Sequence, residues 1–398
     1  SVCVLFLFYI TQAIVTRRTA IVLVCIMLAS GIAGTFYSLF DLTRGRGVIV
    51  ATIKNDSPLR QAHIEAGDAV WRVNGKRVYS TADVDAALKS APADKTVAVS
   101  VISRGEHVER PGLVLTEKLK QQATPAGITG TERTHRFRAS GWTRHYETYS
   151  EILQVLAQLG LGLALAHLRN HGARLRFKLA IAATAILALG IALTAMRTVL
   201  VAFVIGAGII LLRATKGKTK LLATAALGLV LAFGAFVVWQ TRAQDALTLR
   251  DSSASLRVAV ARVGARRIFL HPVFGHGMDA VHKHWNEWGF PGDQLLGLHS
   301  TPLQLAFDRG LPALLCWLWI MLTFWLLTVR AEHRIRDTGD TNSYGLLLGA
   351  TGALAGFFAS SLVNYNFGDA EVALVFWWLM GIVVVLSYKE RLAAPGNV

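Results

Sequence analysis

The sequence has little of what disulfide-bonded, nucleotide-binding or soluble globular proteins carry. Its three cysteines, Cys3, Cys25 and Cys316, all lie in apolar runs and form no CxxC pair, so we expect small packed residues rather than a disulfide framework. The chain has no Walker loop and no GxSxG nucleophile motif. Charged residues make up only 17% of the 398 residues, against about 25% in soluble domains, which argues against a cytosolic globular protein.

Acidic residues are scarce relative to basic ones. Asp and Glu total 25 against 41 Lys and Arg, which gives a formal net charge of +16. In a soluble protein this excess would suggest a nucleic-acid partner, but no basic helix or module of stacking aromatic residues accompanies it. We therefore expect no nucleic acid, and assign the charge to basic loops that hold the cytoplasmic face of a membrane and contact anionic lipids.

Long apolar runs dominate the rest of the sequence. They lie near residues 1–15, 19–40, 150–168, 179–196, 198–212, 220–239, 311–329, 343–363 and 371–388. Most approach the roughly 20 residues that a helix needs to cross a bilayer, although the first and fifth are short. The predicted fold is an all-α polytopic membrane protein with about nine spans in this chain, two of them within residues 1–40.

Basic clusters between the runs set the predicted orientation. They occupy residues 17–18, 169–178, 213–220, 330–336 and 389–391. Placing all five on the cytoplasmic side makes the remaining loops alternate correctly. The segments then predicted to face the outside are residues 41–149, the turn at Arg197, residues 240–310 and residues 364–370.

The run from residue 179 to residue 212 predicts a helical hairpin. It has 34 residues and a single charge, Arg197, near its middle. One helix of that length would measure about 50 Å, well beyond the roughly 30 Å hydrocarbon core. Since basic clusters flank both ends, two helices with Arg197 at the outer turn satisfy both facts.

Residues 41–117 are too polar to cross a membrane and predict a small α+β domain. Residues 47–53 and 96–103 alternate as strands do, and Asn74-Gly75 is a strong hairpin signal. Thr81 is placed to cap a helix over residues 82–90. Residues 118–148 are expected to be a polar linker to the main membrane domain, residues 149–398.

The stretch GVIVATIKNDSPLRQAHIEAGDAVWRVNGKRV, residues 47–78, resembles a bacterial PDZ domain. The resemblance implies capture of a peptide or a protein C-terminus by strand addition, with Arg44–Gly47 as the candidate carboxylate loop. A spacer or docking platform without a peptide ligand is the alternative.

Short polar motifs in the outer segments carry the candidate chemistry. They are Arg138-Ala-Ser-Gly141 with His145, then Arg197, then Arg257, Arg262, Arg266, His271-Pro272, Gly275-His-Gly277 and His299-Ser-Thr-Pro-Leu-Gln304. In this order and on this side, they resemble the O-antigen ligase and polymerase family over residues 138–388. Ser300 stands where that family usually has Asn.

The family resemblance implies a reaction and its reactants. The donor would be a glycan linked to a polyprenyl diphosphate, and the acceptor a hydroxyl of a second glycan, such as lipid A–core, or of a protein. No nucleotide sugar, metal or other cofactor is implied. The fold would be helical, with the loop at residues 240–310 covering the site. The protein would be a multi-pass component of the bacterial inner membrane, with that loop and the PDZ-like domain on the periplasmic side.

The residue types support this chemistry independently. A departing diphosphate needs positive charge, and arginine offers a permanent charge and a bidentate fork for phosphate oxygens. Charge stabilisation of this kind can replace a metal ion. Arg197 and Arg257 are the candidates for this role, with an arginine that merely reaches the membrane interface as the alternative. His299 is the candidate to activate the acceptor or orient the diphosphate, since imidazole titrates near neutrality; a structural histidine is the alternative.

Other polar residues of the outer segments are weaker candidates. Arg138, His145, Arg262, Arg266 and Gln304 are expected to contact substrate. Asp308 and Glu147 could act as a general base, but solvated or interfacial carboxylates fit them better. His282-x-His284 matches no zinc signature. Asp369 and Glu371 of the last outer hairpin could contact sugar or an arginine, or simply cap a helix.

Several functions stay open at this point. The first is a ligase that moves glycan to a second acceptor. The same family offers two other functions, a polymerase and a protein O-oligosaccharyltransferase. The spacing between Arg266 and Gly277 resembles that of a polymerase loop motif. From another class, the chain could be a transporter or a PDZ-bearing membrane receptor. The outer placement of the arginines and His299 argues against a transporter, whose site would lie at mid-membrane.

Overall fold

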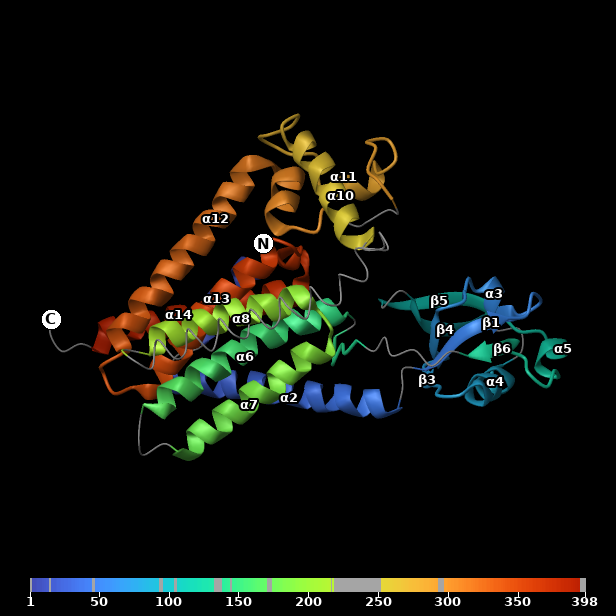
Figure 1. Ribbon diagram of the computed structural model, residues 1–398, viewed down its shortest axis with the longest axis horizontal. Helices are drawn as coiled ribbons and strands as arrows, with labels where there is room; N and C mark the ends of the chain where they lie inside the picture. The colour runs from blue at the N-terminus through green and yellow to red at the C-terminus, as the bar shows by residue number, and fades with distance from the viewer. Residues whose placement is uncertain are drawn as a thin grey trace. The chain divides into compact units, whose positions relative to one another are not determined.

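A computed structural model describes residues 2–13, 16–44, 47–92, 96–103, 106–131, 138–143, 145–169, 174–215, 217, 252–292 and 297–393. The chain divides into two compact units (Figure 1). The helical unit comprises Ser1–Ile32, Glu151–Ile191 and Met196–Val398, and the sheet unit comprises Ala33–Ser150 and Ala192–Ala195.

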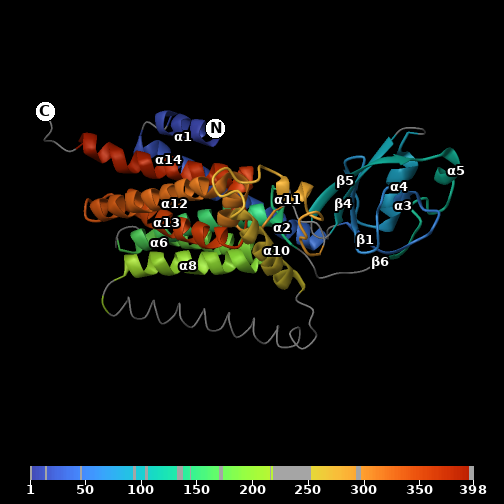
Figure 2. The same ribbon diagram turned by 90° about the horizontal axis from the view of Figure 1, so that it is seen from above.

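Helices account for most of the described structure outside the sheet. They are α1 Val2–Ala13, α2 Arg17–Arg44, α6 Tyr146–Leu168, α7 Arg174–Leu193, α8 Arg197–Ala214, α10 Ser252–Ile268, α11 Ala280–Lys283, α12 Thr301–Ile335, α13 Thr341–Ser361, the 3₁₀ turn η1 Asn366–Gly368 and α14 Ala370–Ala393. Figures 1 and 2 show α6, α8 and α13 running side by side, while α12 is inclined to them in Figure 1.

Seven helices of the described part are long and apolar enough to cross a membrane, namely α2, α6, α7, α8, α12, α13 and α14. The nine predicted spans are therefore not confirmed. The run at 1–15 gives α1, which has only 12 residues and would measure about 18 Å. The run at 220–239 lies outside the described residues. The mostly helical, polytopic class itself is confirmed.

The predicted hairpin at Arg197 is confirmed. Helix α7 ends at Leu193 and α8 begins at Arg197, and both qualify as spans. Between them Ala195 adopts φ 55°, a left-handed conformation that non-glycine residues seldom take, and this residue lets the chain reverse sharply.

Glycines let α13 pack closely against its neighbours. A Cβ added at Gly349 would lie 2.7 Å from the carbonyl oxygen of Gln158 in α6, and one at Gly352 would lie 2.7 Å from that of Gly206 in α8. No side chain fits at such distances. Small residues of this kind let backbones approach in membrane proteins, where packing rather than hydrophobicity drives helix association.

Basic residues from several predicted cytoplasmic loops meet at one end of the helical unit. Arg17 at the start of α2 binds Asp340, the residue before α13, at 3.2 Å. Arg213, in the last turn of α8, pairs with the buried carboxylate of Glu332 in α12 at 2.5 Å. Arg197 begins α8, so it lies at the opposite end of that helix.

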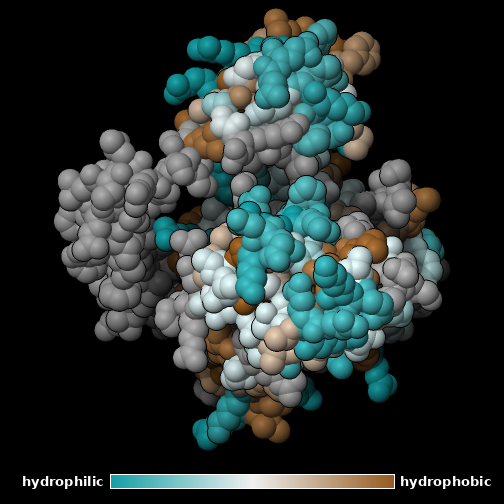
Figure 3. Space-filling model, turned by 90° about the vertical axis from the view of Figure 1, so that its right-hand side faces the viewer, coloured by the Kyte–Doolittle hydropathy of each residue, from teal (hydrophilic) through white to brown (hydrophobic). Residues whose placement is uncertain are grey.

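The sheet unit holds an antiparallel sheet in the order β5-β4-β2-β1-β6, with β3 paired to β2. Its elements are β1 Val48–Ile53, α3 Pro58–Gln61, β2 Ala69–Val73, β3 Lys76–Arg77, α4 Thr81–Ser90, β4 Thr96–Ser103, β5 Glu106–Val114, α5 Glu117–Lys120 and β6 Ile128–Thr131. Alternate residues of the strands and the apolar face of α4 form one core, which includes Val50, Val70, Val84, Leu88 and Val99. Hydrophilic side chains cover much of the side of the protein that faces the viewer in Figure 3.

The local signals of this unit are largely confirmed. Asn74 and Gly75 have φ 49° and 74°, as the predicted two-residue hairpin requires. The predicted helix cap was off by one residue, because Ser80 rather than Thr81 is the N-cap. Ser80 Oγ accepts the Asp83 N–H at 3.1 Å, and Asp83 accepts the Ser80 N–H in return at 3.0 Å. Backbone N–H donation, first from Tyr79, lowers the pKa of Asp83.

The sheet extends into the segment expected to be a linker. Strand β6 pairs antiparallel with β1 and joins Ile128 to Ile53. The loop before it is fixed on α4, since the Ala126 N–H donates to Asp85 Oδ1 at 2.8 Å. The sheet therefore continues to Thr131, beyond the predicted boundary at residue 117. The predicted carboxylate loop at 44–47 lies partly outside the described residues.

Candidate functional site

Arg197 is the first residue of α8, and its side chain is exposed. Backbone N–H groups at a helix N-terminus carry partial positive charge and favour anions. The guanidinium adds a full positive charge at the same end of the helix. This end of α8 is therefore electropositive, as the sequence predicted for the outer turn.

The charge of Arg257 acts on His299, although the two residues are 42 positions apart in the sequence. Arg257 lies on α10, and His299 precedes Ser300, the N-cap of α12, with φ 52°; both side chains are half-buried. Burial, and secondly the positive charge of Arg257, lower the pKa of His299. This shift favours the neutral form of the imidazole, which is the form that accepts a proton.

A buried asparagine joins the segments that carry Arg197 and His299. Asn364, which is 1% exposed, donates from Nδ2 to Thr198 Oγ1 at 3.3 Å. Its backbone carbonyl oxygen accepts the N–H and the hydroxyl of Thr301, each at 3.1 Å. Thr198 follows Arg197, and Thr301 comes two residues after His299. The starts of α8 and α12 are therefore held through one side chain and its backbone.

A carboxylate fixes this asparagine in turn. Glu151 of α6 is 1% exposed, and its Oε1 accepts hydrogen bonds from Asn364 Nδ2 at 3.1 Å and from Ser360 Oγ at 2.8 Å. Asn366 adds a second link, because its Oδ1 accepts from the Thr301 and Ser361 hydroxyls at 3.0 and 3.1 Å. The network spans α6, α8, α12 and α13.

These asparagines were not among the residues predicted from the sequence, which favoured the carboxylates beside them. Asp369 Oδ1 accepts the N–H groups of Glu371 and Val372 at 3.0 and 3.3 Å, so it caps α14, one of the two roles that the sequence left open. The missed signal was the pair Asn364 and Asn366, two amides in a short hairpin between apolar runs.

Gln304 lies inside the protein rather than on its surface. It is 3% exposed, its Oε1 accepts the Leu298 N–H at 2.7 Å, and its Nε2 donates to Asp308 Oδ1 at 2.9 Å. Both ends of the amide are thus engaged with the protein. This arrangement fixes the backbone directly before His299, which suits a positioning residue better than the substrate contact that we expected.

The His271–Gly277 turn completes a break in α12. Gly310 has φ 83° and ψ 171°, and Pro312 lacks an N–H group, so the helical ladder is interrupted there. Three backbone hydrogen bonds replace it: His276 N to Phe307 O (2.8 Å), Gly277 N to Asp308 O (3.0 Å) and Leu311 N to Pro272 O (2.7 Å). A Cβ at Gly275 would lie 2.5 Å from Arg309 N, so this contact requires glycine.

The remaining candidates have different surroundings. Arg262 and Arg266 are exposed on α10. His284 Nδ1 lies 2.6 Å from Glu287 Oε2, and its ring stacks on Trp288. Among the described residues, no group of three His, Cys, Asp or Glu side chains is placed to hold a metal ion.

Two candidates, Arg138 and His145, belong to the sheet unit. The guanidinium of Arg138 lies 4.5 Å from the ring centroid of Tyr146. His145 Nδ1 accepts the Glu147 N–H at 3.3 Å. The segment after Arg138 is bonded to the end of α7, since Ala139 N donates to Leu193 O at 2.9 Å.

Comparison with protein-family models gives two matches. An O-antigen ligase model matches residues 182–318, which include Arg197, Arg257 and His299. A PDZ domain model matches residues 31–109, which include strands β1 to β4. No curated protein matches the chain. The chain is therefore similar to O-antigen ligases over residues 182–318 and to PDZ domains over residues 31–109, and its apolar helices indicate a multi-pass membrane protein.

Proposed function

We propose that the protein transfers a glycan from a polyprenyl-diphosphate carrier to a hydroxyl acceptor. The observation that carries the proposal is the shared hydrogen-bond network of Asn364. It holds the segments of Arg197 and His299 together, while Arg257 lies close enough to His299 to lower its pKa. Two permanent cations and a neutral imidazole are thereby available at one end of the helical unit.

The arginines suit the leaving group. When the bond between the anomeric carbon and the phosphate oxygen breaks, negative charge develops on the diphosphate. Arg197 and Arg257 would stabilise that charge through bidentate hydrogen bonds, and guanidinium groups retain their charge throughout the physiological pH range. Electrostatic stabilisation placed where charge develops often contributes more to rate enhancement than any other catalytic effect.

His299 suits the acceptor. The acceptor oxygen forms the new bond to the anomeric carbon and loses its proton, which the neutral imidazole of His299 would accept. The products are the glycosylated acceptor and the free polyprenyl diphosphate. Gln304 and Asn364 would act as positioning residues for this step, since they hold the segments on which Arg197 and His299 lie.

The reaction would take place on the periplasmic face of the bacterial inner membrane. Arg17 and Arg213 lie at the end of the helical unit opposite Arg197, and basic loops favour the cytoplasmic side. The lipid diphosphate of the donor would lie at the membrane surface beside Arg197. Membrane lipids are therefore the immediate surroundings of the site, as well as the carrier of its substrate.

A reconstituted assay tests the proposal. The full chain in liposomes receives a polyprenyl-diphosphate-linked glycan with or without lipid A–core, and the products are resolved by size. Glycan on lipid A–core supports a ligase, and a ladder on the carrier supports a polymerase. A donor left intact with lipid A–core but consumed with a protein hydroxyl acceptor supports protein glycosylation. A donor left intact in every mixture contradicts transfer.

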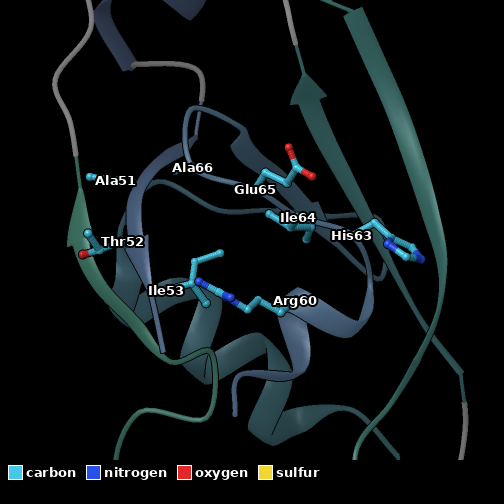
Figure 4. Close-up of a pocket in the computed structure, with 8 residues that line it drawn as sticks. All are labelled: Ala51, Thr52, Ile53, Arg60, His63, Ile64, Glu65 and Ala66. Atoms are coloured by element: carbon cyan, nitrogen blue, oxygen red, sulfur yellow. The ribbon is translucent and has the colours of Figure 1, made fainter. Parts of the chain in front are cut away.

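The PDZ domain adds a separate binding proposal. Strands β5 and β6 are the outer members of the described sheet, and a peptide or protein segment could add to such an edge. A pocket of about 420 Å³ lies beside β1 and α3, with Arg60, His63 and Glu65 among its lining residues (Figure 4). A pull-down of periplasmic proteins by the full chain and by a chain without residues 48–131 compares their partners.

A further inference from the structure

A second cavity lies wholly within the sheet unit, away from the pocket of Figure 4. Its volume is about 510 Å³, within the range of small-molecule sites. Three segments line it: the end of α2, strands β2, β4 and β5 of the PDZ domain, and the turn at 140–143. The lining residues are Tyr37, Asp41, Trp71, Arg72, Ser100, Val108, Glu109, Ser140, Gly141, Trp142 and Thr143.

Aromatic rings form the apolar part of this cavity. Tyr37 and Trp142 stack with their centroids 4.7 Å apart, and Trp142 remains 60% exposed. Gly141 places Trp142 there, since it adopts φ 52° and a Cβ would overlap the ring of Tyr149. Only glycine allows the turn to lie this close to Tyr149.

A β-bulge supplies the third ring. Val70 pairs with Val101 and Arg72 pairs with Ser100, so Trp71 is the extra residue on β2. A bulge redirects side chains out of the regular alternation, which explains how the adjacent residues Trp71 and Arg72 both line the cavity. The Arg72 guanidinium lies 4.1 Å from the Trp71 ring centroid.

Polar groups surround the rings. Asp41 forms a 3.0 Å ion pair with Arg77, and Glu109 and Ser100 lie on the strands. In the part of the chain that the structure describes, the buried Nε of Arg72 has no hydrogen-bond partner, and a donor left in this state calls for an acceptor. Acidic and basic groups are balanced, which favours a ligand rich in hydroxyls over one with strong charge.

We infer that this cavity binds an oligosaccharide. A sugar ring presents an apolar C–H face, which stacks on aromatic rings, and an edge of hydroxyls, which pair with carboxylate, guanidinium and hydroxyl groups. The cavity offers both in one place. Ala139, next to the lining turn, donates its N–H to Leu193 O at 2.9 Å, and Leu193 lies four residues before Arg197 in the chain.

The sugar has two sources under the proposed function: the glycan of the donor or the glycan of the acceptor. Binding itself does not depend on transfer. Two water-soluble probes separate the sources, namely the repeat-unit oligosaccharide released from the carrier and the core oligosaccharide released from lipid A–core. Each is titrated into the full chain in nanodiscs, and binding is followed by saturation-transfer difference NMR.

We expect one of the two probes to bind. Trp142→Ala removes a stacking ring and should weaken binding about tenfold, and the milder Arg72→Gln should weaken it in the same direction. Phe36→Ala is the matched control, because Phe36 is an exposed aromatic residue of α2 that does not line the cavity. It should bind as the wild type does.

Binding that survives both Trp142→Ala and Arg72→Gln, or the failure of both probes to bind the folded wild type, would overturn the inference. The Arg257→Ala variant separates this result from the proposed function. Sugar binding retained in a variant that transfers nothing supports the cavity and the transfer site as distinct parts. If the wild type transfers nothing while Trp142→Ala loses sugar binding, the cavity stands and the proposed function fails.

Discussion

The helical unit and the PDZ domain bury polar side chains in different ways. In the helical unit, Glu151 and Asn364 are each 1% exposed and bonded to groups from several helices. In the described PDZ domain, the buried polar residues Ser57 and Asp68 serve turns, since Ser57 Oγ donates to Ala126 O at 2.6 Å and Asp68 accepts the Glu65 N–H. Buried amides and carboxylates are costly without partners, so their concentration beside Arg197 and His299 marks the part of the molecule where placement matters most.

This contrast divides the expected effects of mutation. Changes in the helical unit's network should alter the transfer step. Changes in the PDZ domain should instead alter the stability of that domain or the binding of the glycan.

The largest effect is expected at Arg197. Arg197→Ala removes a permanent charge from the developing diphosphate and should lower kcat about 10²- to 10³-fold. Arg197→Lys should retain part of the activity, because it keeps a charge without the bidentate fork. Turnover of the donor in liposomes measures both. Arg334→Ala, an exposed arginine at the far end of α12, is the control, and wild-type turnover in Arg197→Ala would remove that residue from the site.

Asn364→Ala tests the network itself. It removes the donor to Glu151 and Thr198 and should cost about 1–3 kcal/mol of unfolding free energy. It should also lower kcat more than it raises KM, because Thr198 at the start of α8 loses its bond to Asn364, while the backbone carbonyl that holds Thr301 is retained. Ser360→Ala is matched to it, since Ser360 also bonds Glu151 but neither Thr198 nor Thr301. Equal losses of kcat in the two variants would argue against a positioning role for Asn364.

Removal of residues 48–131 tests the independence of the PDZ domain. The deletion includes β6, because a cut at residue 117 would leave that strand without its partner β1. We expect the transfer chemistry to survive and KM for the glycan whose cavity is lost to rise about tenfold. A folded deletion variant with no turnover on any acceptor would place the PDZ domain inside the active site.

The pH dependence tests the pairing of Arg257 with His299. Burial and the Arg257 charge lower the pKa of His299, so the neutral, proton-accepting form persists below the usual pKa of about 6.5. The acid limb of kcat/KM should therefore lie below that value. Arg257→Gln removes the repelling charge and should move the His299 pKa upward, followed by NMR of labelled histidine. A downward shift would contradict the geometry.

The smallest effect is expected at the cap of α4. Ser80→Ala removes the side-chain acceptor of the Asp83 N–H and should cost about 1 kcal/mol of PDZ-domain stability. Thermal unfolding of the full chain measures this loss. Donor turnover at a temperature where the domain remains folded should be unchanged, and a large loss of turnover would break the division between the two regions.

Patterns that depend on neighbouring residues were predictable from the sequence. The apolar runs indicated the spanning helices, the single charge at Arg197 indicated the turn between α7 and α8, and Asn74-Gly75 indicated a hairpin. Hydropathy and turn geometry act over a few residues, so a single sequence expresses them directly. The same limits explain the error at Thr81, since Ser80 and Thr81 are both good caps and the partner Asp83 decides between them.

Features that depend on distant partners were not predictable. No local pattern indicates that Asn364 bonds Thr198, that Gln304 serves the backbone at Leu298, or that β6 returns to pair with β1. The cavity is similar, because Tyr37, Trp71 and Trp142 are far apart in the chain and meet only after folding. Contacts of this kind make up most of the candidate site, which is why its residue types could be predicted but its arrangement could not.

The most direct test of the central claim is the transfer assay in liposomes with the wild type and Arg197→Ala side by side. We predict that the wild type consumes the polyprenyl-diphosphate-linked glycan and releases polyprenyl diphosphate, while the folded variant leaves the donor almost intact. The proposed transfer would be contradicted if both proteins consumed the donor equally, or if the folded wild type left the donor intact with every acceptor tested.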